Sequence, residues 1–284
     1  MYIVSGSTGN TGSVVAKTLL EKNLPVRVIV RSQEKGAALA KLGAEPAIAD
    51  LQDAAALTEA LRGGKVLYLM NPPSYQSEDQ FVELEKVIES FQTAIKNAAL
   101  EKIVVLSSIG GQVSSGTGNI LTAYKLEQAF GDLEIPVTFV RAGSFMENWN
   151  SVLETAKTAG VLPSFYQPLD RKIPQVAAAD IGRVAAEAMQ EKTTGKEVKE
   201  LAGFWTSPEE TAEAFGKVLG KEVKAVAVPE NQWTDILKNH NSPKNAASLA
   251  EMFAGFNSGH IKFEGENQIA GKITMEDFVR EALK

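Results

Sequence analysis

A glycine-rich segment near the N-terminus has the composition and position of a phosphate-binding loop. It spans residues 6–12, Gly-Ser-Thr-Gly-Asn-Thr-Gly, between the strand-like residues 2–4 and the amphipathic residues 13–22. When a strand, a glycine turn and a helix follow in that order, unpaired amides and the positive end of the helix dipole point at a bound pyrophosphate. The glycines have no side chain, so the backbone can approach the pyrophosphate closely. The segment therefore predicts dinucleotide binding. The residues expected at the cofactor are Gly6, Ser7, Thr8, Gly9, Asn10, Thr11 and Gly12.

The residue after the second expected strand bears on which dinucleotide is bound. Arg31 follows the strand-like residues 26–30. At this position a carboxylate would hold the ribose hydroxyls of NAD, whereas a guanidinium accepts the 2′-phosphate of NADP, with Ser32 and Lys35 within reach of the same group. NADP(H) is therefore favoured over NAD(H). The alternative is that Arg31 is a solvated loop residue and that Glu34 supplies the ribose contacts.

Other classes of chemistry are excluded or disfavoured by the composition. The chain has no Cys and only two His, so thiolate nucleophiles, disulfides and Cys-ligated metal centres are excluded, and we expect no metal site. The net charge of −6 offers no general attraction to nucleic acid. No apolar run approaches the roughly 18 residues that cross a bilayer, and no basic leader precedes the first strand. We therefore expect a cytoplasmic protein with neither a membrane nor a nucleic-acid partner.

The glycine loop and Arg31 must be held by a regular alternation of strands and helices. Short apolar runs at 2–4, 26–30, 47–49, 66–70, 103–106 and 137–140 are typical of buried strands. Amphipathic segments separate them, and the clearest covers residues 80–99. Strands that are apolar on both faces and separated by helices indicate an α/β fold with a doubly wound parallel sheet of the Rossmann type.

The alternation loosens in the second half of the chain. Prolines at 163, 168 and 174 interrupt the region that follows Gly143. We therefore expect a Rossmann-type domain over 1–147, to which 175–203 return, and a smaller α/β substrate-binding region over 148–174 and 204–284. In that region, Trp149, Phe165 and Tyr166 are candidates to line a pocket, although aromatics spread through such a region more often form a small core.

Several segments, taken in order, resemble the NmrA-like family, an atypical group of short-chain dehydrogenases/reductases. The glycine spacing Gly-x2-Gly-x2-Gly is similar to that of the group, and residues 140–148 resemble its Arg-Pro-Gly-x-Phe-x-Glu-Asn motif, with Ala142 in place of proline. Segments 176–185 and 275–278 extend the resemblance over nearly the whole chain. It implies that Asp50 and Leu51 contact the adenine and that Ser107 polarises a substrate carbonyl. The same fold places Met70 and Asn71 near the nicotinamide ribose, and Gly143 is a further residue expected at the cofactor.

The usual proton donor of short-chain reductases is not evident. These enzymes carry Tyr-x3-Lys on one helical face, and none of the five tyrosines here has that lysine. Counted back from Pro136, Ala123 falls at the position of the lysine, while Tyr124 and Lys125 are adjacent and point about 100° apart. Either a helix shortened by two residues returns Lys125 to the active face, or the donor is missing. Tyr124, Lys125 and Ser107 are the catalytic candidates.

The resemblance implies an NADPH-dependent oxidoreductase that passes hydride to a small conjugated acceptor, such as a quinone, an azo compound or a dye. Such acceptors delocalise the incoming electrons and can take a proton from water. The alternative from another class is a non-catalytic NADP(H)-binding redox sensor that binds a partner protein. A sugar-nucleotide epimerase on the same fold would ordinarily need the tyrosine and lysine at their helical spacing. The sequence leaves homodimerisation open.

Overall fold

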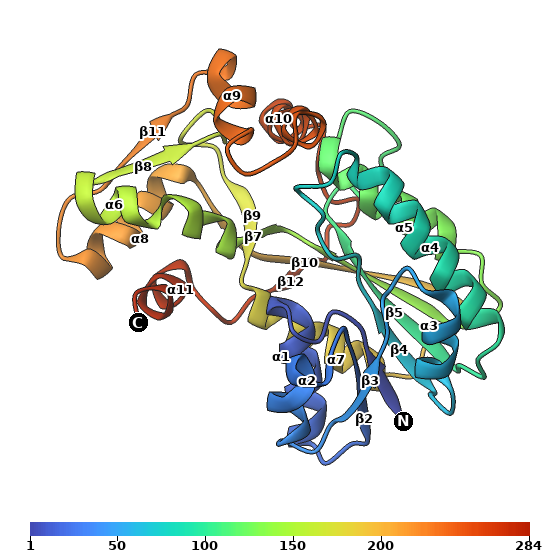
Figure 1. Cartoon of the computed structure of the whole chain (residues 1–284). Coiled ribbons are helices and arrows are strands. Elements are labelled where there is room, and N and C mark those ends of the chain that lie inside the picture. The colour runs from blue at the N-terminus through green and yellow to red at the C-terminus, as the bar shows by residue number, and fades with distance from the viewer.

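A twisted, mostly parallel sheet forms the centre of the protein in the computed structural model, which describes residues 1–284 (Figure 1). Its parallel strands are β1 (Tyr2–Val4), β2 (Val26–Val30), β3 (Glu45–Ile48), β4 (Val66–Leu69), β5 (Lys102–Ser108), β6 (Val137–Ala142) and β10 (Lys196–Thr206). Their order is β3-β2-β1-β4-β5-β6-β10, and every neighbouring pair is parallel. The order reverses direction between β1 and β4, as in a Rossmann-type sheet. The predicted doubly wound fold is therefore confirmed.

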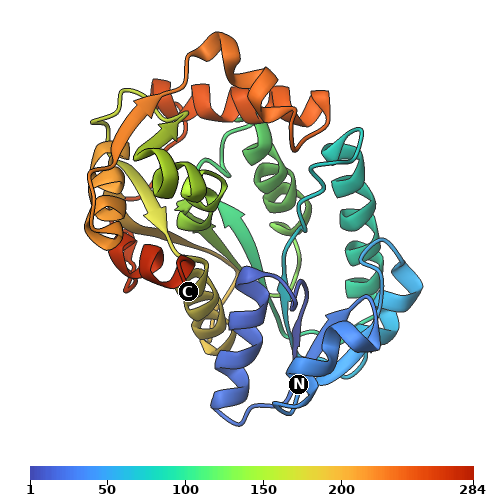
Figure 2. The same ribbon diagram turned by 60° about the vertical axis from the view of Figure 1, so that its left-hand side comes forward.

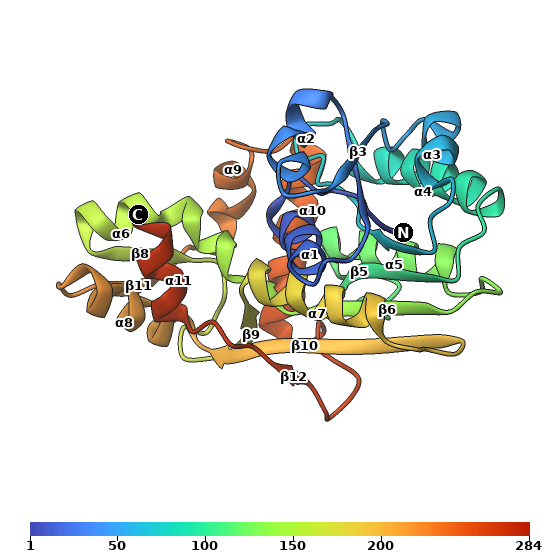
Figure 3. The same ribbon diagram turned by 90° about the horizontal axis from the view of Figure 1, so that it is seen from below.

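Helices cover both faces of this sheet (Figure 1 and Figure 3). One face carries α1 (Asn10–Glu21), α2 (Gln33–Ala40) and α7 (Ala178–Gln190), and the other carries α3 (Ala54–Leu61), α4 (Gln80–Lys96) and α5 (Leu121–Phe130). In β1, Val4 belongs to the core on the first face and Ile3 to the core on the second. Because neighbouring strand residues point to opposite faces, strands covered on both sides must be apolar throughout.

Local capping signals set where several helices begin. Asp53 accepts hydrogen bonds from the amides of Ala55 and Ala56 at the start of α3, and Asp79 accepts one from the amide of Phe81 at the start of α4. These side chains satisfy amides that have no partner inside a helix. The amphipathic stretch expected at 80–99 accordingly forms a helix that begins at Gln80 and ends at Lys96.

A second group of elements lies on the carboxyl-terminal side of the strands (Figure 2). It consists of β7 (Ser144–Phe145), α6 (Leu153–Ala159), β8 (Val161–Ser164), β9 (Ile173–Val176), α8 (Pro208–Leu219), β11 (Lys224–Ala227), α9 (Trp233–Leu237), α10 (Pro243–Ser258), β12 (Ile269–Ala270) and α11 (Met275–Ala282), with short 3-10 turns at 118–120, 146–152 and 230–232. The end of β10 joins it by pairing with β9. It has a hydrophobic core of its own. None of the helices combines the length and the apolar composition needed to span a bilayer.

Candidate functional site

The glycine loop between β1 and α1 has the geometry of an anion-binding turn. Gly6 has a φ of +58°, and an added Cβ there would lie 2.8 Å from Cγ of Met70. A Cβ at Gly12 would overlap the carbonyl group of Gly6, so both positions require glycine. The amides of Asn10, Thr11 and Gly12, in the first turn of α1, donate no hydrogen bond within the chain, and the preceding Gly9 provides no side-chain cap. These free amides fit the pyrophosphate of a dinucleotide.

Two hydroxyl side chains of the loop hold the loop itself. Ser7 donates its hydroxyl to the carbonyl of Ile29 in β2 at 3.0 Å, and the Tyr68 hydroxyl donates to Thr11 at 3.2 Å. Burial raises the pKa of Tyr68 above its usual range, which keeps the phenol neutral. Ser7 and Thr11 can therefore meet a phosphate through their amides, whereas Thr8 and Asn10 are exposed and can also use their side chains.

The predicted adenine-end residues lie at the carboxyl ends of β2 and β3. Arg31 is exposed directly after β2, and its guanidinium forms no hydrogen bond or ion pair within the chain. Ser32 caps α2 by accepting from the amide of Lys35. After β3, Asp50 is exposed and Leu51 is half-buried. Since β3, β2 and β1 are neighbours in the sheet, these residues end on the same edge as the glycine loop.

The loop after β4 is held by α10, a connection that the sequence analysis missed. The Met70 amide donates to the Ser5 hydroxyl at 3.1 Å, and Asn71 follows it half-buried. Further along, the Asn245 side chain, 1% exposed at the start of α10, bonds to several backbone groups of the loop. Its amide nitrogen donates to the carbonyls of Ser74, Tyr75 and Ser77, and its oxygen accepts from the Gln80 amide.

Ser107, at the end of β5, belongs to a buried network of charged side chains. Its hydroxyl donates to Oε1 of Glu127 at 2.6 Å. Arg141 of β6 donates to the same carboxylate through Nε at 2.8 Å and Nη2 at 2.7 Å, and Nη1 donates to Glu264. Burial lowers the pKa of Arg141, but Glu127 and Glu264 outweigh it and raise that pKa above its usual range. A Cβ at Gly111 would lie 2.7 Å from the Ser107 hydroxyl, so Gly111 covers it closely.

Tyr124 and Lys125 point to different surroundings from Ser107. Lys125 forms an ion pair with Glu85 of α4, with 2.7 Å between Nζ and Oε1. Tyr124 is half-buried, and its hydroxyl has no hydrogen bond within the chain. Ala123 and Glu127, four residues apart on α5, are both buried and share the inner face of the helix. The three candidates therefore do not form a hydrogen-bonded group, and their catalytic assignment stays a prediction.

Gly143 lies where β6, β9 and β10 meet. A Cβ there would lie 2.8 Å from the carbonyl oxygen of Pro174. The neighbouring Ser144 hydroxyl is 2.7 Å from that of Tyr166, whose pKa burial raises to about 12. Trp149 is buried as well and donates to Gln175 at 2.6 Å. Trp149 and Tyr166 thus belong to the core of the smaller region, whereas Phe165 is only half-buried.

Comparison with known proteins places these features in a family. The sequence matches the NmrA-like family over residues 2–276. Quinone oxidoreductase 2 of Escherichia coli (strain K12) is 30% identical over 267 residues, which cover 92% of this chain and 88% of that protein. The NAD(P)H azoreductase of Xenophilus azovorans is 27% identical over 257 residues, which cover 89% and 86%.

Solved structures of other proteins resemble the fold of this chain over its whole length. The NADPH-dependent quinone oxidoreductase of Escherichia coli gives a TM-score of 0.80 at 28% identity, with both chains covered completely, and a structure of it complexed with NADPH gives the same TM-score. Triphenylmethane reductase of Citrobacter sp. gives a TM-score of 0.82 at 20% identity over 99% of each chain, which is a likeness of fold. The chain therefore belongs to the NmrA-like family, as the order of its motifs predicts.

Proposed function

We propose that this protein is an NADPH-dependent reductase that passes hydride to a small conjugated acceptor, such as a quinone, an azo compound or a dye. The observation that carries the proposal is the set of free amides in the first turn of α1, beneath the glycine loop at the end of β1. The names of the relatives, a quinone oxidoreductase and an azoreductase, support this reaction class. Bound NADPH would supply the hydride.

Arg31 supports NADPH over NADH. Its guanidinium is exposed at the end of β2 and engages no other group, so it can accept a 2′-phosphate without breaking an existing interaction. The relative solved with NADPH agrees with this preference. At the far end of the cofactor, Met70 and Asn71 would lie against the nicotinamide ribose, in the loop that Asn245 holds.

The surroundings of Ser107 support a conjugated acceptor over a simple ketone. A ketone develops alkoxide charge that needs a positioned proton donor, whereas a quinone or a dye delocalises the charge and takes its proton from water. Here the Ser107 hydroxyl donates to Glu127, and the Lys125 ammonium pairs with Glu85. The Ser107 hydroxyl and the Lys125 ammonium are thus each engaged by a carboxylate of the chain, which supports an acceptor that needs no positioned proton donor.

The same arrangement is what a non-catalytic NADP(H) sensor would have, so the two functions must be separated by turnover. Purified protein is titrated with NADPH and NADH, and the absorbance of the reduced nicotinamide is followed after addition of menadione, an azo dye or a triphenylmethane dye. Loss of NADPH that depends on the acceptor supports the reductase. Tight NADPH binding without turnover supports the sensor, and no binding would refute both.

Four further expectations follow from the sequence. The chain is proposed to divide into a cofactor-binding domain, over 1–147 with 175–203, and a substrate-binding region over the remaining residues. The reason is that the aromatic-rich region lies beside the carboxyl ends of the strands. A small molecule is the proposed substrate. A cytoplasmic location and a homodimer stay predictions.

A further inference from the structure

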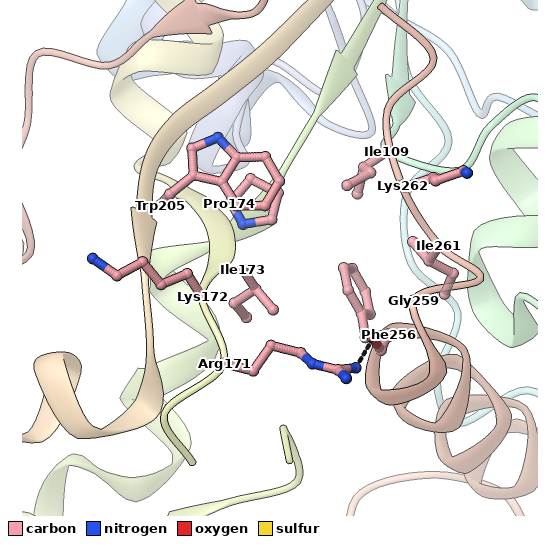
Figure 4. A pocket seen from close by; sticks show the side chains of 10 residues that line it. All are labelled: Ile109, Arg171, Lys172, Ile173, Pro174, Trp205, Phe256, Gly259, Ile261 and Lys262. Atoms are coloured by element: carbon pink, nitrogen blue, oxygen red, sulfur yellow. Dashed lines mark hydrogen bonds between the residues drawn. The ribbon is translucent and has the colours of Figure 1, made fainter. Parts of the chain in front are cut away.

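A pocket of about 170 Å³ lies between the paired strands β9 and β10 on one side and the end of α10 on the other (Figure 4). None of the residues expected at the cofactor lines it. The lining residue Ile109 directly follows Ser108, the last residue of β5. The pocket is therefore a feature separate from the glycine loop and Arg31.

The walls of the pocket are apolar and aromatic. Ile173, Phe256 and Ile261 are buried lining residues whose side chains face the space in Figure 4. Trp205 of β10 lies on the same side of the pocket as Ile173 of β9, across from Phe256, and is 47% exposed, whereas Trp149 and Trp233 are 6% and 3% exposed. An indole ring with this exposed fraction beside an apolar pocket offers a large apolar surface on which a flat ring can pack.

The charged groups around the pocket are all cations. None of the ten lining residues is acidic, although the chain as a whole has a net charge of −6. Lys172 is neutralised by Glu210 at 2.7 Å, and Lys262 forms no ion pair. Arg171 lies along one side of the pocket and donates through Nη1 to the carbonyls of Phe256 and Asn257. Its Nε and Nη2 have no partner within the chain.

We propose that this pocket binds a small aromatic carboxylate. The ring lies between Trp205 and Ile173 of the paired strands on one side and Phe256 of α10 on the other, and the carboxylate accepts hydrogen bonds from Nε and Nη2 of Arg171. These two groups form the side-on fork that matches both oxygens of a carboxylate. Lys262 adds attraction at the rim. The proposal is independent of the proposed reductase activity.

Tryptophan emission tests the proposal, because Trp205 is the exposed indole. Titration with benzoate is expected to change the emission with millimolar affinity, and the change is expected to disappear in Trp205→Phe. Benzamide, which has the ring without the charge, and acetate, which has the charge without the ring, are expected to bind at least about tenfold more weakly. Equal binding of benzoate and benzamide, or a full response in Trp205→Phe, would overturn the proposal.

Two variants test the charge and the space separately. Arg171→Met is expected to weaken benzoate binding about tenfold or more, whereas Lys41→Gln, at an exposed lysine elsewhere, leaves it unchanged. Since Arg171 also bonds to the end of α10, Ile173→Phe is the second variant, because it fills the pocket and keeps the guanidinium. Unchanged benzoate affinity in both variants would refute the site. NADPH binding, measured on the same samples, reports on the proposed function separately.

Discussion

Lys125 of α5 forms its ion pair with Glu85 of α4, at 2.7 Å, while Ser107 donates to Glu127 on the inner face of α5. Lys125 and Glu127 therefore lie on different faces of α5, and Ser107 of β5 contacts the face that carries Glu127. Lys125 does not share the buried face of Ala123, which favours the alternative in which the usual proton donor is missing, and the catalytic assignment stays a prediction. This arrangement also makes the contribution of each side chain separable by substitution.

Replacing Lys125 tests whether its ammonium takes part in the reaction. We expect Lys125→Met to change kcat by less than about threefold and to lower the free energy of unfolding by less than about 1 kcal/mol, since Glu85 is exposed and Lys125 is only half-buried. Steady-state kinetics with NADPH and menadione and urea denaturation measure both. Lys86→Met, which breaks the exposed pair with Glu83, is the matched control. A fall in kcat of a hundredfold would restore Lys125 as a catalytic residue.

Substitution at Gly6 tests the phosphate loop. Gly6→Ala forces a side chain into a left-handed backbone conformation and against Met70, so we expect NADPH binding to weaken at least tenfold and stability to fall by about 1–2 kcal/mol. Gly63→Ala is the control, because Gly63 has a φ of +72° with open space around it. It carries the same backbone strain and should bind NADPH normally. Calorimetric titration of both variants would reveal an equal loss if the loop had no special role.

Substitution of Arg31 tests the preference for NADPH over NADH. Arg31→Asp removes the guanidinium and places a carboxylate near the 2′-phosphate, so we expect the Kd for NADPH to rise at least tenfold while the Kd for NADH changes little. Fluorescence titration with both nucleotides gives the ratio. Lys41→Asp makes the same charge change at another exposed position and should leave the ratio as it is. Unaltered NADPH affinity in Arg31→Asp would reject the assignment.

The buried network at Ser107 should be important for stability. Glu127→Gln removes the buried carboxylate from Arg141 and leaves the guanidinium with Glu264 and, at 3.7 Å, Glu200, so we expect a loss of about 1.5–3 kcal/mol in the free energy of unfolding. Glu264 contacts the same guanidinium but is 58% exposed, and Glu264→Gln should cost less than about 1 kcal/mol. Urea denaturation compares the two. Similar losses would mean that burial does not set the strength of this network.

Asn245 is expected to position the loop after β4. Asn245→Ala removes the donor and the acceptor that hold this loop, so we expect stability to fall by about 1–3 kcal/mol and the KM for NADPH to rise more than kcat falls. Asn239→Ala, at an exposed residue before α10, is the control. A variant that loses stability with an unchanged KM would show that Asn245 stabilises the fold without positioning the cofactor loop.

Local patterns in the sequence were enough to predict the fold and the glycine loop. The alternation of apolar strands and amphipathic helices depends on side-chain periodicity within each segment, and the loop depends on three glycines spaced between a strand and a helix. Both are encoded over a few neighbouring residues. Arg31 could be placed for the same reason, since a residue that ends a strand next to β1 must lie on the same edge of the sheet.

Only the tertiary structure decided which side chains from distant parts of the sequence are partners. Glu85 lies 40 residues before Lys125, Glu264 lies 123 residues after Arg141, and Asn245 lies 165 residues after Gln80. No spacing in the sequence reports such partners, because they depend on how separate helices and loops come together in space. The sequence by itself therefore determined the fold and the expected dinucleotide site, whereas packing between distant segments decided which partners the side chains of the catalytic candidates have.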